Sequence, residues 1–299
     1  MKRLKPEPAV PGGTKFGRVT TSGGDALAAQ PRALIVTIYG LYAREVGGWL
    51  SISALIRLMA ELGADEPAVR SAISRLKQRG LLEPRREGGA AGYGLSEHGR
   101  AILAEGDMRI FQRSRASSAE GWLLAVFSVP EDQRSRRHAL RSRLAWLGFG
   151  AVAAGVWIAP AQLAAETRDV LAADGLSEYV SLFTADYLAF GDVRQQVSRW
   201  WDLDRLEQLY QAFIDSAAPV LARWVCSADP VDQGQAFADY VRLLTAWRRL
   251  PFLDPGLPPG LLPEDWHGTR AAELFARLRE LLGGPAREHV ASVTGRPPA

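Results

Sequence analysis

The segment from Asp65 to Gly80, DEPAVRSAISRLKQRG, constrains the fold most, because its pattern fits one capped helix with one buried side. Its apolar positions follow the i, i+3, i+4, i+7 spacing of a single helical face: Val69, Ala72, Ile73 and Leu76. Asp65 suits the N-cap, Pro67 suits the first turn, and Gly80 suits the residue after the last turn. The segment therefore predicts a helix that is buried along one face and exposes a basic face.

The flanking sequence predicts what surrounds this helix. Helical spacing from Pro31 to Glu45, and again from Ser51 to Gly63, predicts two preceding helices. The short segments Leu81–Arg86 and Tyr93–Leu95 flank a Gly-rich stretch, as the strands of a β-hairpin do. Another helix begins at Ser96. This order of elements predicts an N-terminal winged helix-turn-helix.

The basic face is either simply solvated or reads DNA. Six basic and two acidic residues lie between Glu66 and Arg86, so the local field is positive. A helix fits the major groove, where Arg, Lys, Ser and Gln reach base edges. The tight turn before the helix and the hairpin after it favour DNA binding over a solvated face. The predicted DNA-binding residues are Arg70, Ser71, Ser74, Arg75, Lys77, Gln78, Arg85 and Arg86, with Arg32 and Arg44 as further candidates for the DNA backbone.

Beyond the first unit, the pattern divides the chain twice more. GWLLAVFSVP, GAVAAGVWIAP and EYVSLFTADYL read as strands that alternate with two helices, which predicts a ferredoxin-like α/β sandwich. From Val193 onward the spacing is almost entirely helical. The fold class is thus α+β and multidomain, with a disordered arm (1–30), the winged helix (31–115), the ferredoxin-like unit (119–192), a helical effector and dimerisation domain (193–285) and a disordered tail (286–299).

Composition and sequence pattern limit the cellular compartment and the kinds of partner that we expect for the protein. The arm is rich in Lys, Pro and Gly and has no apolar core of the kind a secretory signal needs. No apolar run reaches the length of a membrane span, and the single cysteine, Cys226, fits a reducing compartment. We therefore expect a cytoplasmic protein without membrane contact. With 36 Lys+Arg, the chain permits an anionic partner without requiring one.

Four stretches together resemble the PaaX family of transcriptional repressors: VRSAISRLKQRGLL, YGLSEHGR, GWLLAVFSVP and LLPEDWHG. The resemblance runs from about Pro31 to Leu282, and WRRLPFLDPGLPPGLLPEDWHG is its most specific part. It implies a homodimer that represses genes of aromatic catabolism, typically phenylacetate degradation, by binding a double-stranded DNA operator. It also implies release by an acyl-CoA effector such as phenylacetyl-CoA, which is a ligand and not a cofactor.

The resemblance also relates the central unit to a small CRISPR-associated nuclease, so an enzyme is an alternative. Such a nuclease needs a carboxylate at the end of its first strand to hold a divalent metal. Here that strand ends VFSVP, and Glu131 and Asp132 follow only in the turn. The four His are scattered, without ligand spacing. We expect no catalytic residue and no metal site. A protein-recruiting adaptor that ignores acyl-CoA is the other alternative.

An acyl-CoA presents phosphates to cations and flat rings to aromatic side chains. The stretches YVRLLTAWRRL and PEDWHG combine both kinds of residue, although aromatics at helical spacing also fit a hydrophobic core. The candidate effector residues are Tyr240, Arg242, Trp247, Arg248, Arg249, Trp266 and His267. RSRRHALRSR, with five Arg from Arg134 to Arg143, fits a solvated helix face as well as a site for DNA phosphate, a CoA diphosphate or an acidic partner.

Overall fold

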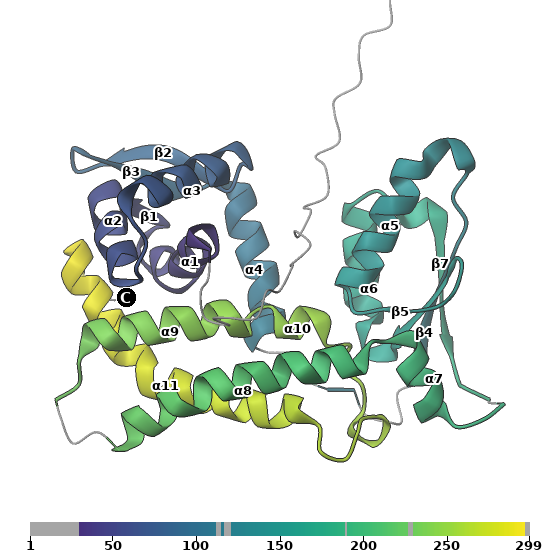
Figure 1. The fold of residues 1–299 in the computed structure, drawn as a ribbon. Coiled ribbons are helices and arrows are strands. Elements are labelled where there is room, and N and C mark those ends of the chain that lie inside the picture. The colour runs from purple at the N-terminus through teal and green to yellow at the C-terminus, as the bar shows by residue number, and fades with distance from the viewer. Residues whose placement is uncertain (1–29, 112–114, 117–120, 189, 227–229, 297–299) are drawn as a thin grey trace, which may run out of the picture.

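The computed structural model describes residues 30–111, 115–116, 121–188, 190–226 and 230–296. It is a mixed α+β protein with a three-stranded sheet, a four-stranded sheet and a C-terminal helical region (Figure 1). All but the last residue of the arm predicted at 1–30 lies outside the described residues. No helix in the described part of the chain is both long and apolar enough to span a bilayer.

The first unit has the predicted helices and hairpin. Its sheet is antiparallel in the order β1-β3-β2, and β1, a short strand before the second helix, was not predicted. The chain after the first helix continues through a π-helical turn (Tyr39–Ala43) and a 3₁₀ turn (Arg44–Val46). The elements are α1 (Pro31–Ile38), β1 (Trp49–Ser51), α2 (Ile52–Glu61), α3 (Glu66–Gln78), β2 (Leu82–Glu87), β3 (Ala90–Leu95) and α4 (Glu97–Phe111).

Helix α3 forms as its sequence predicts. The Asp65 side chain accepts a 2.8 Å hydrogen bond from the Ala68 N–H, and Pro67 lies in the first turn. Gly80 takes a positive φ of 69°, and the N–H groups of Gly80 and Leu81 bond back to Lys77 and Leu76. These paired bonds close the helix end as a Schellman motif. The four predicted apolar residues are all buried, so the opposite face is left to solvent.

The central unit differs from the prediction by one strand. GAVAAGVWIAP forms two antiparallel strands and not one, because Gly155 at φ 81° turns the chain back between them. The sheet order β5-β6-β4-β7, antiparallel throughout, agrees with the ferredoxin-like prediction. The elements are β4 (Trp122–Phe127), α5 (Arg134–Trp146), β5 (Gly150–Ala153), β6 (Val156–Pro160), α6 (Ala164–Ala173) and β7 (Val180–Ala185).

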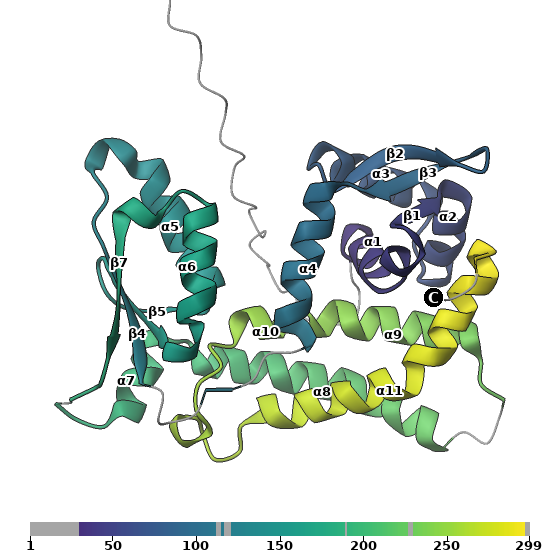
Figure 2. The same cartoon turned by 180° about the vertical axis from the view of Figure 1, so that it is seen from behind.

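The C-terminal region is helical, as predicted, but its last helix is longer. The tail predicted as disordered at 286–299 is helical to Thr294, although Gly283, Gly284 and Pro285 interrupt the pattern. Ala286 and Val290 are buried in the main core, and this packing outweighs the poor helix propensity of the three residues. The helices are α7 (Val193–Trp200), α8 (Leu203–Cys226), α9 (Gln233–Trp247), α10 (Leu250–Leu253) and α11 (His267–Thr294), and Figure 2 shows α8, α9 and α11 side by side.

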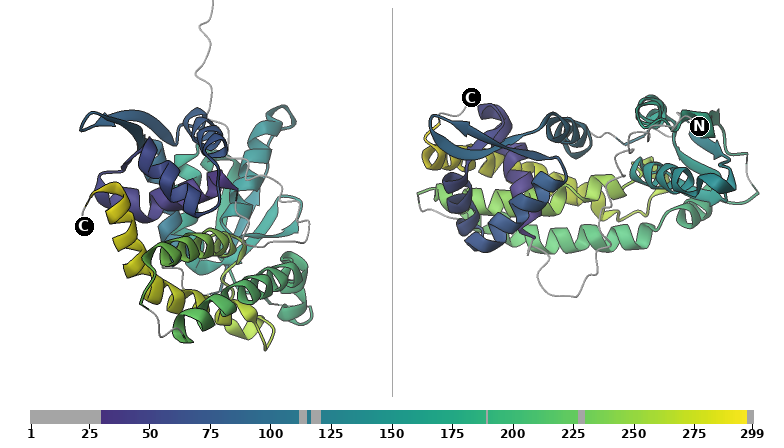
Figure 3. Two further views of the ribbon diagram at one scale, coloured as in Figure 1. Left: turned by 60° about the vertical axis from the view of Figure 1, so that its left-hand side comes forward. Right: turned by 90° about the horizontal axis from the view of Figure 1, so that it is seen from above.

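One hydrophobic core joins the N-terminal unit to the long helices, while the central unit has its own. Across the shared core, the hydroxyls of Thr37 in α1 and Thr245 in α9 form a buried 2.7 Å hydrogen bond. Arg109 links α4 to the central unit: it pairs with Glu166 at 2.9 Å and lies 4.3 Å from the Trp146 ring centroid. Figure 3 shows the N-terminal and central units over opposite ends of the long helices.

Candidate nucleic-acid interface

Helix α3 and the β2–β3 hairpin lie on the side of the N-terminal unit that faces away from α8 (Figure 1). Because the apolar face of α3 is buried, its polar face is turned outward. All of its predicted DNA-binding side chains are exposed: Arg70, Ser71, Ser74, Arg75, Lys77 and Gln78. Arg85 and Arg86 of the hairpin are exposed as well.

A groove of about 350 Å³ lies between the N-terminal half of α3 and the hairpin. Arg70 contributes to it from the helix, and Arg85 and Arg86 contribute from β2. Ile52 and Tyr93 provide apolar surface in the same groove. The fold thus brings three of the predicted DNA-binding guanidinium groups to one concave surface, with Arg75, Lys77 and Gln78 further along the helix.

The outer face of the hairpin depends on two glycines of β3. Gly92 is buried under the Trp49 indole, and a Cβ at Gly92 would lie 2.6 Å from two ring carbons of Trp49. Trp49 Nε1 donates a 3.0 Å hydrogen bond to the carbonyl oxygen of Arg85. Gly94 leaves room for the stem of Arg85 on the same face. The Gly-rich stretch therefore has a packing role that the sequence did not predict.

Intramolecular carboxylates pair with two of the groove arginines. Arg70 pairs with Glu66 one turn earlier at 2.6 Å, and Arg85 pairs with Glu87 at 3.1 Å. Both arginines are about half exposed, so each pair contributes only about 0–1 kcal/mol and a phosphate can replace it. Among the described residues, Arg86 has no such carboxylate partner.

The C-terminal end of α3 brings cations close to Arg32 of α1. Burial lowers the pKa of Arg32 in α1, and the positive charges of Arg79 and Arg75 lower it further. The guanidinium groups of Arg75 and Arg79 therefore lie close enough to Arg32 to repel it, which contributes to an electropositive surface suited to phosphate. Arg79 was missed as a site residue because it follows the last buried position of the helix.

Arg44 has a structural role. It forms a bidentate pair with Asp107 of α4, at 2.6 and 3.0 Å, and donates to the carbonyl oxygen of Gly40. In α5, three of the five arginines are also engaged: Arg134 and Arg137 with Glu131, and Arg143 with Asp174. The basic stretch of α5 is therefore partly neutralised by its own neighbours.

The candidate effector residues do not come together in one site. Tyr240, Trp247 and Trp266 are buried in the core, where Trp247 stacks on Phe275 at 4.8 Å between centroids. Burial lowers the pKa of Arg248 to about 10, and its Nη2 donates to the carbonyl oxygen of Ala33. Arg249 is exposed. Arg242 lies beside the backbone of Glu61, and His267 lies 2.5 Å from the Glu207 carboxylate.

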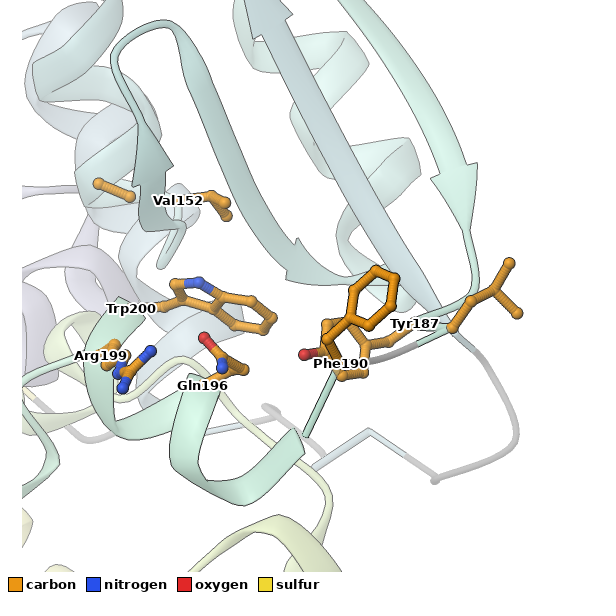
Figure 4. A pocket seen from close by; sticks show the side chains of 8 residues that line it. Val152, Tyr187, Phe190, Gln196, Arg199 and Trp200 are labelled. Carbon is orange, nitrogen blue, oxygen red and sulfur yellow. The ribbon is translucent and has the colours of Figure 1, made fainter. Parts of the chain in front are cut away.

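A separate cavity of about 620 Å³ lies where the central unit meets α7 (Figure 4). Tyr187 and Trp200 pack edge to face there, 5.9 Å apart, with Phe190, Arg199 and Gln196 around them. None of the predicted effector residues lines this cavity. The turn acids of the central unit, Glu131 and Asp132, are exposed, and no cluster of three or more potential metal ligands occurs among the described residues.

Comparison with known families decides the relationship. Residues 30–99 match the model of the PaaX-like protein, residues 115–197 match the PaaX protein central Cas2-like domain, and residues 201–292 match the PaaX-like protein C-terminal domain. The chain belongs to the PaaX family. The resemblance predicted from the sequence is thus confirmed, and the second match agrees with the expected likeness of the central unit to a CRISPR-associated nuclease.

Relatives of known sequence or structure support this membership. The transcriptional repressor PaaX of Escherichia coli (strain K12) is 29% identical over 265 residues, which cover 88% of this chain and 83% of that protein. Among solved structures, the uncharacterized protein Rv0674 from Mycobacterium tuberculosis has a TM-score of 0.54 and 25% identity. That match covers 86% of this chain and 98% of the other.

Proposed function

We propose that this PaaX family member is a transcriptional repressor that binds double-stranded DNA through its N-terminal unit. The groove between α3 and the β2–β3 hairpin carries the proposal, because Arg70, Arg85 and Arg86 converge on it. In a winged helix-turn-helix, α3 would enter the major groove and the hairpin would follow the adjacent backbone. The Escherichia coli relative is a transcriptional repressor, which supports a repressor in place of an enzyme.

Each part of the surface has a distinct task in this proposal. Arg70, Ser71, Ser74, Lys77 and Gln78 face the base edges, and Arg85 and Arg86 contact phosphates beside the helix. Arg75, together with Arg32 and Arg79, supplies a positive field for the backbone. A homodimer would place two α3 helices one DNA turn apart, or a multiple of it, so the operator would be an imperfect palindrome.

The family resemblance further supports an acyl-CoA effector, such as phenylacetyl-CoA, and a target operon for aromatic catabolism. To release the repressor, the effector must bind the DNA-incompetent arrangement more tightly, and each 1.4 kcal/mol of preference corresponds to about tenfold. A panel of acyl-CoA thioesters tests this by thermal shift and by release of bound DNA. Stable DNA binding in the presence of every thioester would instead favour the adaptor.

Selection from a random pool of duplexes, followed by fluorescence anisotropy, tests the DNA site. We expect Arg70→Ala and Lys77→Ala each to weaken binding of the selected duplex by about tenfold or more, the cost of one lost base contact. Arg168→Ala, which removes an exposed arginine of α6, is the control and should bind as the wild type does. Unchanged affinity in both α3 variants would contradict the assignment of the recognition face.

A further inference from the structure

The C-terminal end of the chain contacts the hairpin of the proposed DNA-binding surface. Figures 1 and 2 show the end of α11 and the turn of the hairpin on the same side of the molecule. Arg296, just after α11, pairs with Glu87 at 2.5 Å, and its guanidinium lies 4.8 Å from the Trp49 ring centroid. Residues more than two hundred positions apart therefore meet on the outer face of the hairpin.

Glu87 is shared between two cations. Its Oε1 accepts from Arg85, at 3.1 Å, and its Oε2 accepts from Arg296, at 2.5 Å. With both arginines present, this group of three side chains carries a net charge of +1. Without Arg296, the carboxylate would pair with Arg85 alone and neutralise it.

Trp49 connects the same arginine to the hairpin backbone. The indole packs on Gly92, lies 4.8 Å from the Arg296 guanidinium, and donates its N–H to the carbonyl oxygen of Arg85. The Arg296 guanidinium over the indole therefore adds a cation–π attraction to its ion pair with Glu87. Arg296 thus contacts both groups that hold Arg85, the carboxylate and the indole.

We propose that Arg296 is a positioning residue for DNA binding, which holds the hairpin and keeps Arg85 available to a phosphate by occupying one oxygen of Glu87. This inference rests on the proposed function, since it concerns the same DNA-binding surface. It gives the C-terminal helix a direct link to the hairpin. A shift of α11 that moves Arg296 away from Glu87 would therefore change the net charge that the hairpin presents to DNA.

Affinity and its salt dependence test this role. Arg296→Gln should weaken binding of the selected duplex about three- to tenfold and lower the slope of log K against log salt by about one, the effect of one lost phosphate contact. Arg296→Lys keeps the charge beside Glu87 and should restore most of the affinity. In an Arg85→Ala background, Arg296→Gln should cause no further loss, because Arg296 acts through Arg85.

Arg287→Gln is the matched control, because it removes an ion pair of α11, Arg287–Glu45, that does not involve the hairpin. It should leave the affinity unchanged. Wild-type affinity in Arg296→Gln, or an equal loss in the Arg85→Ala background, would overturn the positioning role. A wild-type protein that selects no duplex would refute the proposed function instead.

Hydrogen exchange in the DNA-free protein tests the positioning without any DNA. Amides of residues 85–92 should exchange faster in Arg296→Gln than in Arg287→Gln, because only the first variant releases the hairpin. Equal protection in both variants would overturn the inference whatever the outcome of the binding experiments.

Discussion

Replacing Gly92 with alanine should separate Trp49 from the hairpin and destabilise the N-terminal unit. The new Cβ would lie 2.6 Å from Cε2 and Cζ2 of Trp49, and closer still to the carbonyl oxygen of Leu50 on the neighbouring strand. The backbone oxygen cannot rotate away, so β1 and β3 must move apart or the indole must leave. Overpacking costs about 1–3 kcal/mol and the lost Trp49–Arg85 hydrogen bond adds about 1, for a total of about 2–4 kcal/mol.

Gly94→Ala is the matched control for this prediction. Gly94 lies on the same strand as Gly92. A Cβ added at Gly94 would meet no atom closer than Cδ of Arg85, at 3.5 Å, which is an ordinary van der Waals contact. Its free energy of unfolding should therefore change by less than about 0.5 kcal/mol. In thermal unfolding, Gly92→Ala should lower Tm by several degrees, since 1 kcal/mol corresponds to about 2–4 °C. Equal shifts in the two variants would refute the argument that the Trp49–Gly92 contact holds the hairpin.

Three further outcomes are expected. Glu66→Gln releases Arg70 from its intrahelical partner, so DNA affinity should rise a few-fold in anisotropy titrations, and an unchanged affinity would contradict this. Burial lowers the pKa of Arg248 from its usual value to about 10, so the folded state loses this proton first and this group's contribution to stability rises with pH above about 10. Arg248→Met should therefore be at least as stable as the wild type near neutral pH, with a difference that narrows above pH 10. Arg249→Met is its exposed control. Asp254 is buried and accepts from Arg115, Tyr210 and the Gly256 N–H, so Asp254→Ala should cost about 3–5 kcal/mol in urea unfolding, and a cost below 1 kcal/mol would exclude that role.

The elements that could be predicted are those whose local signals agree. In α3 the cap, the apolar spacing and the glycine stop all indicate the same helix, and the structure has that helix with the same buried residues. Ser96 likewise begins α4, where its hydroxyl accepts from the Gly99 N–H. The start and end of such a helix depend on residues only a few positions away, so the local sequence is enough to predict them.

The features that could not be predicted depend on contacts between distant segments. The helical turns after Pro285 exist because Ala286 and Val290 reach the core shared with the N-terminal unit. Gly92 accommodates Trp49, which is 43 positions away in the chain. No local sequence pattern indicates that these two residues pack together. The same holds for the effector candidates, since helical spacing alone does not separate core aromatics such as Trp247 from residues that bind a ligand.

The charges on the proposed interface divide it into two functional halves. In the groove, carboxylates of the protein itself already pair with Arg70 and Arg85, so a phosphate or base must displace Glu66 or Glu87 before it gains the contact. At the other end, Arg75 and Arg79 repel Arg32, and a phosphate of the DNA backbone relieves that repulsion. We therefore expect the unpaired end to supply most of the sequence-independent affinity. Within the groove, Arg70 supplies discrimination between sequences, because a poor base contact does not compensate for its broken ion pair with Glu66.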